Sequence, residues 1–410
     1  MLSSVYRLIG GGFRLVAGHC VRLLRLVRCS ARDVLVVAPA SPGSIGDEAM
    51  LHALCSALYR KELRPVVGVA SEGDSYKTIG VHDTYPLYRY HSLGSISDRL
   101  RLVLSLTRFR AVYLIGADCM DGFYSEYDSL RRLQIAGLAS VSGASAVITG
   151  FSFNAQPTPQ IVAEMAGQPE GVTLYARDKE SLNRLHFHGI TRARLVADLA
   201  FLLEAGITEA HTQAAVDWSR ERRCSGRTVI GVNISFIHTL SSDVYSPQRI
   251  VDCSTQLIEA VAAKFPLTSF ILIPHDVRGE HSDAALLQRV YERVSAYDVF
   301  MYPPPLHACD IKALAAHLDM GLTGRMHFAI ACLGSGVPVF CLEYQDKFSG
   351  LLGFFGLESE ALPAATAFKS EVLAEKCMNM LERLPEVAAQ VTLHLDEVKQ
   401  LSRRNMEGLR

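Results

Sequence analysis

The stretch Val34–Ala70, VLVVAPASPGSIGDEAMLHALCSALYRKELRPVVGVA, sets two short apolar runs on either side of a longer helical segment. The runs Val34–Pro39 and Pro65–Ala70 are rich in β-branched residues, which is typical of buried strands. Glu48–Lys61 lies between them and is predicted to be a helix. The apolar residues on one face of this helix are Leu51, Leu54, Cys55 and Leu58. A strand, a helix and a strand in this order predict a parallel βαβ unit.

The same alternation continues towards the carboxyl end of the chain. In the first half, further strands are predicted at Ala111–Gly116, Ser145–Gly150, Val172–Ala176 and Arg194–Ala197, with helices around Leu130–Ser140 and at Lys179–His186. In the second half, strands are predicted at Val229–Ile234, Ser269–Pro274, Val299–Tyr302, Met320–Thr323 and Val337–Leu342. Helices are predicted there at Gln248–Lys264, Ala284–Ser295, Ile311–His317, His327–Leu333, Ser370–Leu384 and Glu386–Leu401. Strands that alternate with helices imply a parallel, doubly wound sheet in each half.

The polar stretch Glu204–Arg227 separates the two halves and has few β-branched residues. We therefore predict a basic amphipathic segment over 1–30, an α/β domain over 31–205, a linker over 206–227 and a second α/β domain with closing helices over 228–410. The predicted fold is two Rossmann-like domains with doubly wound parallel sheets that face a cleft. Open parallel sheets bind ligands beyond the carboxyl ends of their strands, so motifs at those positions are the functional candidates.

The composition excludes several classes of protein. Of the 410 residues, 49% are hydrophobic and 20% are charged, which is typical of a globular chain and not of a disordered or fibrous one. The formal net charge of −1 gives no global basic excess for nucleic acid, so any anion site must be local. The ten cysteines form no C-x-x-C pair, which predicts buried, reduced thiols in the cytoplasm and no structural zinc site.

The first thirty residues combine apolar residues with five arginines and contain no acidic residue. The arginines interrupt every apolar stretch, so neither a secretory signal nor a membrane-spanning helix is predicted. One interpretation is an amphipathic helix that lies on an anionic membrane surface. The other is a frayed tail, or a helix docked on the first domain.

The segment Ser41–Met50, SPGSIGDEAM, follows the first predicted strand and opens the first long helix. Its glycines, Gly43 and Gly46, permit a tight turn and a close approach of the backbone. Such a turn presents backbone N–H groups to an anion or a sugar hydroxyl, which makes Gly43, Ser44, Gly46 and Asp47 candidate substrate contacts. A capped tight turn without a ligand explains the same pattern equally well.

The segment Gly324–His327 joins a short strand to a helix. The guanidinium of Arg325 is suited to a carboxylate or phosphate, and His327 is suited to donate or accept a proton. Met326, between them, is a further candidate contact. Each residue alone is more simply explained as a structural ion pair or a buried histidine, but together at the start of a helix they favour function.

Three further strand ends carry polar residues. Arg177, after Val172–Ala176, is either an anion contact or the partner of Asp178 or Asp198 in an ion pair. Asp118 or Asp121, after Ala111–Gly116, is a candidate base for a hydroxyl or a candidate metal ligand. His275 ends the strand Ser269–Pro274, where a lone histidine is more often structural.

Seven segments resemble motifs of the polysaccharide pyruvyl transferase family, and they occur in the family's order from about Val34 to Leu357. They are GSIGDEAML, ARDKES, VADLAF, IGVNIS, LIPHD, TGRMHFAIACLGSGVPV and EYQDKFSGLLGFFGL. In the last of them, Tyr344, Asp346 and Lys347 match the family's pattern. Two segments depart from it. The sequence Ile115-Gly116-Ala117 stands in place of a triple glycine, and Gly150–Pro157 contains fewer glycines than is usual.

The resemblance implies a two-domain fold of the glycosyltransferase B type. It implies transfer of a pyruvyl group from phosphoenolpyruvate to a sugar or lipid-linked oligosaccharide, as a ketal, in bacterial surface polysaccharide biosynthesis and without a cofactor. By the resemblance, Arg325 and His327 hold phosphoenolpyruvate and supply acid catalysis, and Arg177 is a further anion contact. For the acceptor hydroxyls, Asp118 or Asp47 is the candidate base.

Three alternatives fit the same residues. One is a glycosyltransferase that uses a nucleotide sugar on the same fold. Another is a non-catalytic relative that binds a glycan or a partner. The third is a membrane-associated assembly factor that acts through its basic N-terminal segment.

Overall fold

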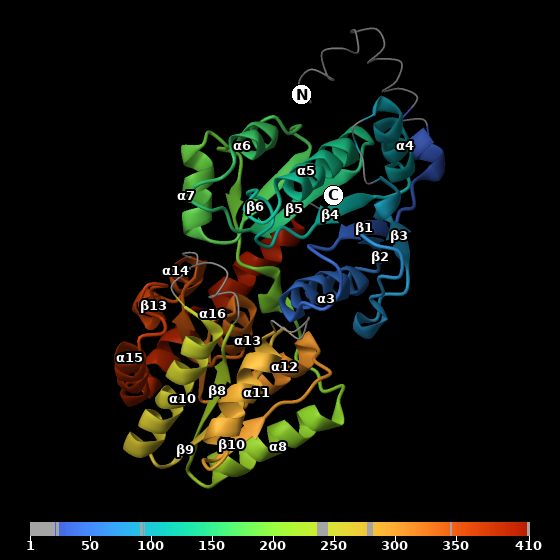
Figure 1. Cartoon of the computed structure of the whole chain (residues 1–410). Helices are drawn as coiled ribbons and strands as arrows, with labels where there is room; N and C mark the ends of the chain where they lie inside the picture. The colour runs from blue at the N-terminus through green and yellow to red at the C-terminus, as the bar shows by residue number, and fades with distance from the viewer. Residues whose placement is uncertain are drawn as a thin grey trace. The chain divides into compact units, whose positions relative to one another are not determined.

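The computed structural model describes residues 21, 24–90, 93, 95–235, 245–276, 282–344 and 347–407. These residues fall into two compact units. Unit 1 holds the described residues of Met1–Pro42, Met50–Leu199 and Leu401–Arg410, and unit 2 holds those of Gly43–Ala49 and Ala200–Gln400. Each unit is built on one parallel sheet with helices between its strands (Figure 1).

Among the described residues, the sheet of unit 1 has seven parallel strands in the order β3-β2-β1-β4-β5-β6-β7. The strands are β1 (Asp33–Val37), β2 (Arg64–Val69), β3 (Thr84–Pro86), β4 (Ala111–Leu114), β5 (Ser145–Phe151), β6 (Val172–Ala176) and β7 (Arg194–Leu195). Because β1 pairs with both β2 and β4, the direction of winding reverses between β1 and β4. Such a switch point is where ligands of open parallel sheets bind.

The helices of unit 1 are the later part of α3 (Ile45–Arg60), α4 (Ile96–Leu106), α5 (Glu126–Val141), α6 (Pro159–Ala166) and α7 (Lys179–Phe187). Its core joins apolar residues of the central strands to those of α5, such as Val112, Ile148 and Leu133. The last residues of the chain close this unit. The side chain of Asn405 accepts a hydrogen bond from Gly150 N–H at 2.7 Å and donates one to the carbonyl of Ala197 at 2.9 Å.

The described sheet of unit 2 has six parallel strands in the order β10-β9-β8-β11-β12-β13. The strands are β8 (Thr228–Asn233), β9 (Thr268–Leu272), β10 (Val299–Met301), β11 (Met320–Thr323), β12 (Val339–Leu342) and β13 (Ala361–Leu362). The helices are α8 (Ala210–Cys224), α10 (Pro247–Lys264), α11 (Asp283–Val294), α12 (Ala308–Ala315), α13 (Met326–Gly334), α14 (Lys347–Leu352), α15 (Ser370–Glu382) and the part of α16 (Leu384–Arg403) that precedes Leu401. Its switch point lies between β8 and β11.

The division into units differs from the predicted domains in three places. Residues Gly43–Ala49 belong to unit 2, although they were predicted within the domain 31–205. Helix α8 occupies most of the predicted linker 206–227, but it packs against β8 and α12 within unit 2. It buries only small residues, such as Ala215 and Val216, which is why its sequence looks like a linker. The third difference is that Leu401–Arg410 belongs to unit 1, although it was predicted within the second domain, 228–410.

The predicted strands and long helices are confirmed, and β6 and β11 match their predicted bounds. Helices α4 and α6 were not predicted. The pattern of α4 is ambiguous because Leu102, Val103 and Leu106 are buried while Ile96, Leu100 and Leu104 on another face are exposed. Six of the nine cysteines in the described part of the chain are buried, and Cys224 is exposed, against the prediction.

Two predictions fall on undescribed positions. Most of the basic segment 1–30 lies outside the described residues, and so does Asp346. Among the described helices, none is both long enough and apolar enough to cross a bilayer.

Candidate functional site

The carboxyl ends of β8 and β11 are joined side by side at the switch point of unit 2. Asn233 ends β8, Thr323 ends β11, and the two residues are partners in register and fully buried. The hydroxyl of Thr323 donates a hydrogen bond to Asn233 Oδ1 at 2.8 Å and accepts one from the N–H of Arg325 at 2.8 Å. These bonds fix the backbone of Arg325 at the point where α13 begins.

The guanidinium of Arg325 is clamped by a buried carboxylate. Its Nε donates to Asp283 Oδ2 at 3.0 Å and its Nη2 to Asp283 Oδ1 at 2.8 Å. Asp283 is the first residue of α11, is fully buried, and also accepts a hydrogen bond from Asn233 Nδ2 at 3.3 Å. A second carboxylate, Asp276, lies 3.5 Å from Nη2. A two-pronged pair of this kind sets the orientation of the guanidinium.

The clamp leaves one edge of Arg325 available. The two N–H groups on its Nη1 have no hydrogen-bond partner in the described part of the chain, and the side chain is 22% exposed. Burial lowers the pKa of Arg325, but the carboxylates of Asp283 and Asp276 outweigh this effect and raise it above its ordinary value. The guanidinium is therefore permanently charged, and its oriented edge suits a carboxylate or phosphate oxygen.

His327, in the first turn of α13, lies against the backbone of Gly46. A Cβ atom added at Gly46 would stand only 2.2 Å from His327 Nδ1, so no side chain fits there without moving the imidazole. The side chain of His327 is partly buried. The group that approaches the backbone of Gly46 is thus the histidine of the second motif.

Other residues of Gly43–Ala49 are bonded to unit 2 as well. Ser44 forms an antiparallel bridge with Asp276. Glu48 Oε1 accepts a hydrogen bond from Ala308 N–H at 2.8 Å, at the start of α12. Gly43 has a φ of 120°, a conformation that favours glycine. The segment predicted to serve the first domain is therefore part of the unit 2 site.

A small buried cavity lies beneath the site. Its volume is about 10 Å³, too small for a substrate, and it is lined in part by His275, His327 and Lys312. Burial lowers the pKa of His275 to about 3, and the neighbouring His327 and Arg325 add to this effect. Burial likewise lowers the pKa of Lys312 to about 8, and its Nζ donates to the carbonyl of Phe201 at 3.1 Å. His275 is therefore a neutral, buried part of the site at neutral pH.

The neutral state of His275 predicts a specific loss of stability in acid. The folded protein binds a proton there only near pH 3, whereas the unfolded chain binds one below the ordinary pKa of 6.5. As the pH falls through this interval, the free energy of unfolding should drop by about 1.4 kcal/mol per pH unit on account of this group. In urea titrations, His275→Gln should make the dependence on pH shallower, and a substitution of the exposed His82 should not. Equal slopes for wild type and His275→Gln would contradict a neutral, buried His275.

The contact between Gly46 and His327 predicts that the effect of Gly46→Ala on stability depends on whether the imidazole is present. Gly46→Ala alone should lower the free energy of unfolding by about 1 to 3 kcal/mol, because the added methyl group displaces the imidazole. In a His327→Ala background the space is vacant, and the same change should be neutral or stabilising by up to about 1 kcal/mol, since alanine favours helix. A double-mutant cycle by urea unfolding measures this coupling. Equal effects in both backgrounds would show that the two residues do not touch.

Arg177 of unit 1 is held by an ion pair. Its Nη1 lies 2.9 Å from Asp198 Oδ2, and its Nε donates to the hydroxyl of Ser152 at 2.8 Å. The side chains of Arg177 and Asp198 are each only 1% exposed. Burial lowers the pKa of Arg177, but Asp198, Asp118 and Asp178 outweigh it and raise the pKa. Of its two predicted roles, the structure shows the ion pair with Asp198.

Asp118 and Asp121 follow β4, at the switch point of unit 1. Asp121 is buried and accepts hydrogen bonds from the backbone N–H groups of Phe123 at 3.0 Å and Asn154 at 3.1 Å, which organise the loop. Asp118 is partly exposed and accepts a hydrogen bond from the hydroxyl of Tyr124 at 3.2 Å. Of the two carboxylates, Asp118 is therefore the better placed to meet a ligand. Ala117, just before it, has a φ of 49°, a left-handed conformation that suits the glycine of the family pattern.

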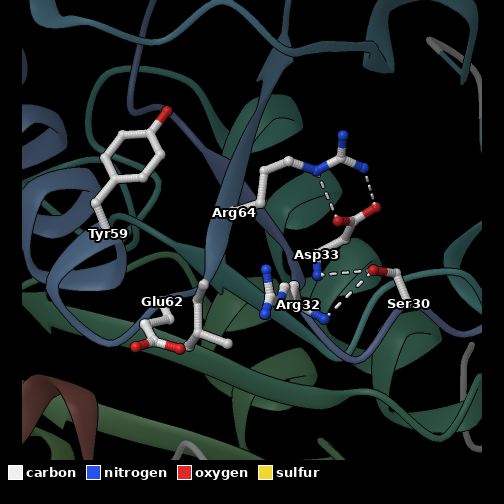
Figure 2. A pocket seen from close by; sticks show the side chains of 7 residues that line it. Ser30, Arg32, Asp33, Tyr59, Glu62 and Arg64 are labelled. Atoms are coloured by element: carbon white, nitrogen blue, oxygen red, sulfur yellow. Dashed lines mark hydrogen bonds and ion pairs between the residues drawn. The ribbon is translucent and has the colours of Figure 1, made fainter.

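A larger pocket, of about 450 Å³, lies at the opposite edge of the unit 1 sheet, where β1 and β2 begin (Figure 2). Figure 2 shows the guanidinium of Arg64 facing the carboxylate of Asp33. Arg64 Nε donates to Asp33 Oδ1 at 2.8 Å, and Nη2 donates to Oδ2 at 2.6 Å. The other charged lining residues, Arg32 and Glu62, are of opposite sign. The pocket has no net charge and lies away from the carboxyl ends of the strands, so it is a poor candidate for an anion site.

The structure thus gathers eight of the ten predicted site residues in unit 2: Gly43, Ser44, Gly46, Asp47, His275, Arg325, Met326 and His327. Met326 is only 4% exposed, so its side chain supports the site from within. Asp118 and Arg177 belong to unit 1. The prediction missed the residues that orient Arg325, namely Asn233, Thr323, Asp276 and Asp283. Asp276 stood beside His275 in a quoted motif, but no local pattern links Asp283 to Arg325.

A family model described as polysaccharide pyruvyl transferase matches residues 45–346. No curated protein matches the chain. Among solved structures, a putative UDP-N-acetylglucosamine 2-epimerase from Listeria monocytogenes aligns with a TM-score of 0.58 and 11% identity, covering 93% of this chain and 96% of that one. An α,α-trehalose-phosphate synthase (UDP-forming) from Burkholderia xenovorans aligns with a TM-score of 0.52 and 11% identity, covering 93% and 100%.

At such low identity the solved structures show the fold alone, which is that of the glycosyltransferase B type, with two parallel-sheet α/β domains. The family match covers most of the chain and includes Gly46, Arg325 and His327, the residues that the unit 2 site is built around. The chain therefore belongs to the polysaccharide pyruvyl transferase family and is a transferase.

Proposed function

We propose that this transferase moves the pyruvyl group of phosphoenolpyruvate onto two hydroxyls of a sugar, as a ketal, in the cytoplasmic synthesis of a bacterial surface polysaccharide. The observation that carries the proposal is the arrangement at the start of α13, where Asp283 orients the guanidinium of Arg325 next to His327. Family membership supports the reaction class and a saccharide acceptor.

The reaction needs one carbon protonation and the loss of phosphate. Two hydroxyls of the sugar form C–O bonds to C2 of phosphoenolpyruvate, and the bond from C2 to the phosphate oxygen breaks. One hydroxyl proton is balanced by the proton that converts the terminal CH₂ group into CH₃, and the other leaves with the phosphate. The active site must therefore supply at least an acid that delivers a proton to carbon and a cation that holds the departing phosphate.

His327 and Arg325 have the chemistry for these two tasks. An imidazole is suited to donate or accept a proton in acid–base catalysis. The Nη1 edge of Arg325 offers two charged N–H donors for one anionic group of the donor, and the N-terminus of α13 adds partial positive charge. We assign the proton transfer to His327, anion binding to Arg325, and the orientation of a sugar hydroxyl to Asp118 or Asp47.

The donor can be tested by thermal stabilisation of the purified protein. A ligand that binds only the folded state raises the melting temperature once its concentration exceeds its dissociation constant, and at a hundredfold excess it adds about 2.7 kcal/mol. Phosphoenolpyruvate should produce such a shift, and inorganic phosphate should produce a smaller one. Arg325→Ala should remove the shift.

The matched control is Arg227, which immediately precedes β8, at the end of the unit 2 sheet where that strand begins, and is paired with Asp298 at 3.0 Å. Arg227→Ala removes a similarly exposed, ion-paired arginine of the same unit and should keep the donor shift. Stabilisation by a UDP-sugar but not by phosphoenolpyruvate would contradict the proposed donor and favour a nucleotide-sugar glycosyltransferase. A shift with phosphoenolpyruvate that survives Arg325→Ala would contradict the role of Arg325.

A further inference from the structure

Helix α4 exposes an apolar stripe that no described residue covers. Ile96, Leu100 and Leu104 are four residues apart, so they share one face of the helix, and their exposed fractions are 68%, 54% and 38%. The buried side chains of this helix are Leu102, Val103 and Leu106, which pack into the core of unit 1. Because these side chains already pack into the core, the exposed stripe is not required for folding.

A second exposed apolar element is bonded to the chain just after α4. Residues 24–28 are helical, and Leu26 and Val27 are 82% and 86% exposed. Arg25 fastens this turn to the chain just beyond α4, where it donates to the carbonyls of Phe109 at 2.9 Å and Arg110 at 3.2 Å. We call the exposed residues Leu26, Val27, Ile96, Leu100 and Leu104 the apolar face.

The two segments that carry this face are basic, although the whole chain has a formal net charge of −1. The segments 24–32 and 95–110 contain seven arginines, at 25, 28, 32, 99, 101, 108 and 110, and a single acidic residue, Asp98. Four of these arginines are exposed: Arg28, Arg32, Arg101 and Arg108. A face that combines exposed leucines with exposed arginines is complementary to a surface that is apolar below and negative above.

We propose that the apolar face of unit 1 docks on the surface of an anionic lipid bilayer. The apolar side chains would enter the boundary between headgroups and acyl chains, and the arginines would lie at the level of the phosphates. Helix α4 has 11 residues, so it is too short to span a bilayer and is suited to lie in the interface. Residues 1–23, which precede the helical turn 24–28 in sequence, contain three more arginines and no acidic residue.

The test is flotation of the full-length protein with vesicles of phosphatidylcholine, with and without phosphatidylglycerol. The wild type should float with the vesicles that contain phosphatidylglycerol, and added salt should weaken this binding. The triple variant Ile96→Ser, Leu100→Ser, Leu104→Ser should lower the partition coefficient by about tenfold or more, because each side chain loses its burial in the bilayer. Arg101→Gln with Arg108→Gln should lower it on anionic vesicles only, by about fivefold for each arginine.

The matched control is Leu393→Ser, which replaces a leucine of unit 2 that is 71% exposed and should leave flotation unchanged. Failure of the wild type to float with anionic vesicles, or equal flotation of the triple variant, would overturn the proposal. So would a dimer in solution that the triple variant converts to monomer, because the occupant would then be a second copy of the chain. Donor-induced thermal stabilisation does not depend on lipid, so this result and that of the donor test can fail independently.

Discussion

His327→Ala is expected to lower the rate of pyruvyl transfer by about two to four decades, the range that one well-placed acid contributes. The donor should still stabilise this variant against heat, because the Arg325 clamp is built from Asn233, Thr323 and Asp283 and does not involve the imidazole. Steady-state release of phosphate, measured with an acceptor that supports turnover, should therefore show a loss in kcat with little change in the KM for phosphoenolpyruvate.

Two companions separate chemistry from packing. His327→Gln keeps a polar side chain at the site, and its rate should lose the basic limb of the wild-type pH profile, because glutamine is not an acid whose deprotonation could slow the reaction. Gly46→Ala, His327→Ala fills the space left by the imidazole without restoring an acid, so its rate should equal that of His327→Ala. Turnover near that of the wild type in His327→Ala would remove the residue from the role of acid.

The sequence predicted the parallel sheets because each strand is a continuous apolar run bounded by a helix. The sequence also placed Arg325, His327 and His275 just after strands, where ligands of such sheets bind, and the structure brings all three together in unit 2. It did not predict that Gly43–Ala49 belongs to the second unit. Alternation of strands and helices follows the chain, whereas the bridge from Ser44 to Asp276 and the contact of Gly46 with His327 join residues more than 200 positions apart.

The same limit applies to the groups that orient the arginines. Nothing in the local sequence of Asp283 distinguishes it from a helix-capping acid, yet it holds the guanidinium of Arg325. The partner of Arg177 is a comparable case in which the correct residue, Asp198, was one of two alternatives. Ion pairs between separate strand ends depend on the order of strands in the sheet, and that order is a property of the whole fold.

Arg177→Met is expected to lower the free energy of unfolding by about 3 to 5 kcal/mol, because it leaves the carboxylate of Asp198 buried without its charged partner. Replacing both residues, as Arg177→Met with Asp198→Leu, should recover much of the loss, since a buried ion pair is often matched by apolar residues of similar size. Urea unfolding gives both values. Arg184→Met is the matched control, because the pair of Arg184 with Glu180, at 3.5 Å, is partly exposed and should be worth at most about 1 kcal/mol.

The double variant also decides whether Arg177 has a second role. If Arg177 only stabilises unit 1, phosphoenolpyruvate should raise the melting temperature of the double variant as much as that of the wild type. If it is also an anion contact, the donor shift should shrink although stability has been recovered.

The ion pair itself would be contradicted by a loss of about 1 kcal/mol or less in Arg177→Met, similar to that in Arg184→Met. The carboxylate of Asp198 is only 1% exposed, so removing its charged partner must cost more free energy of unfolding than removing one partner of a surface pair.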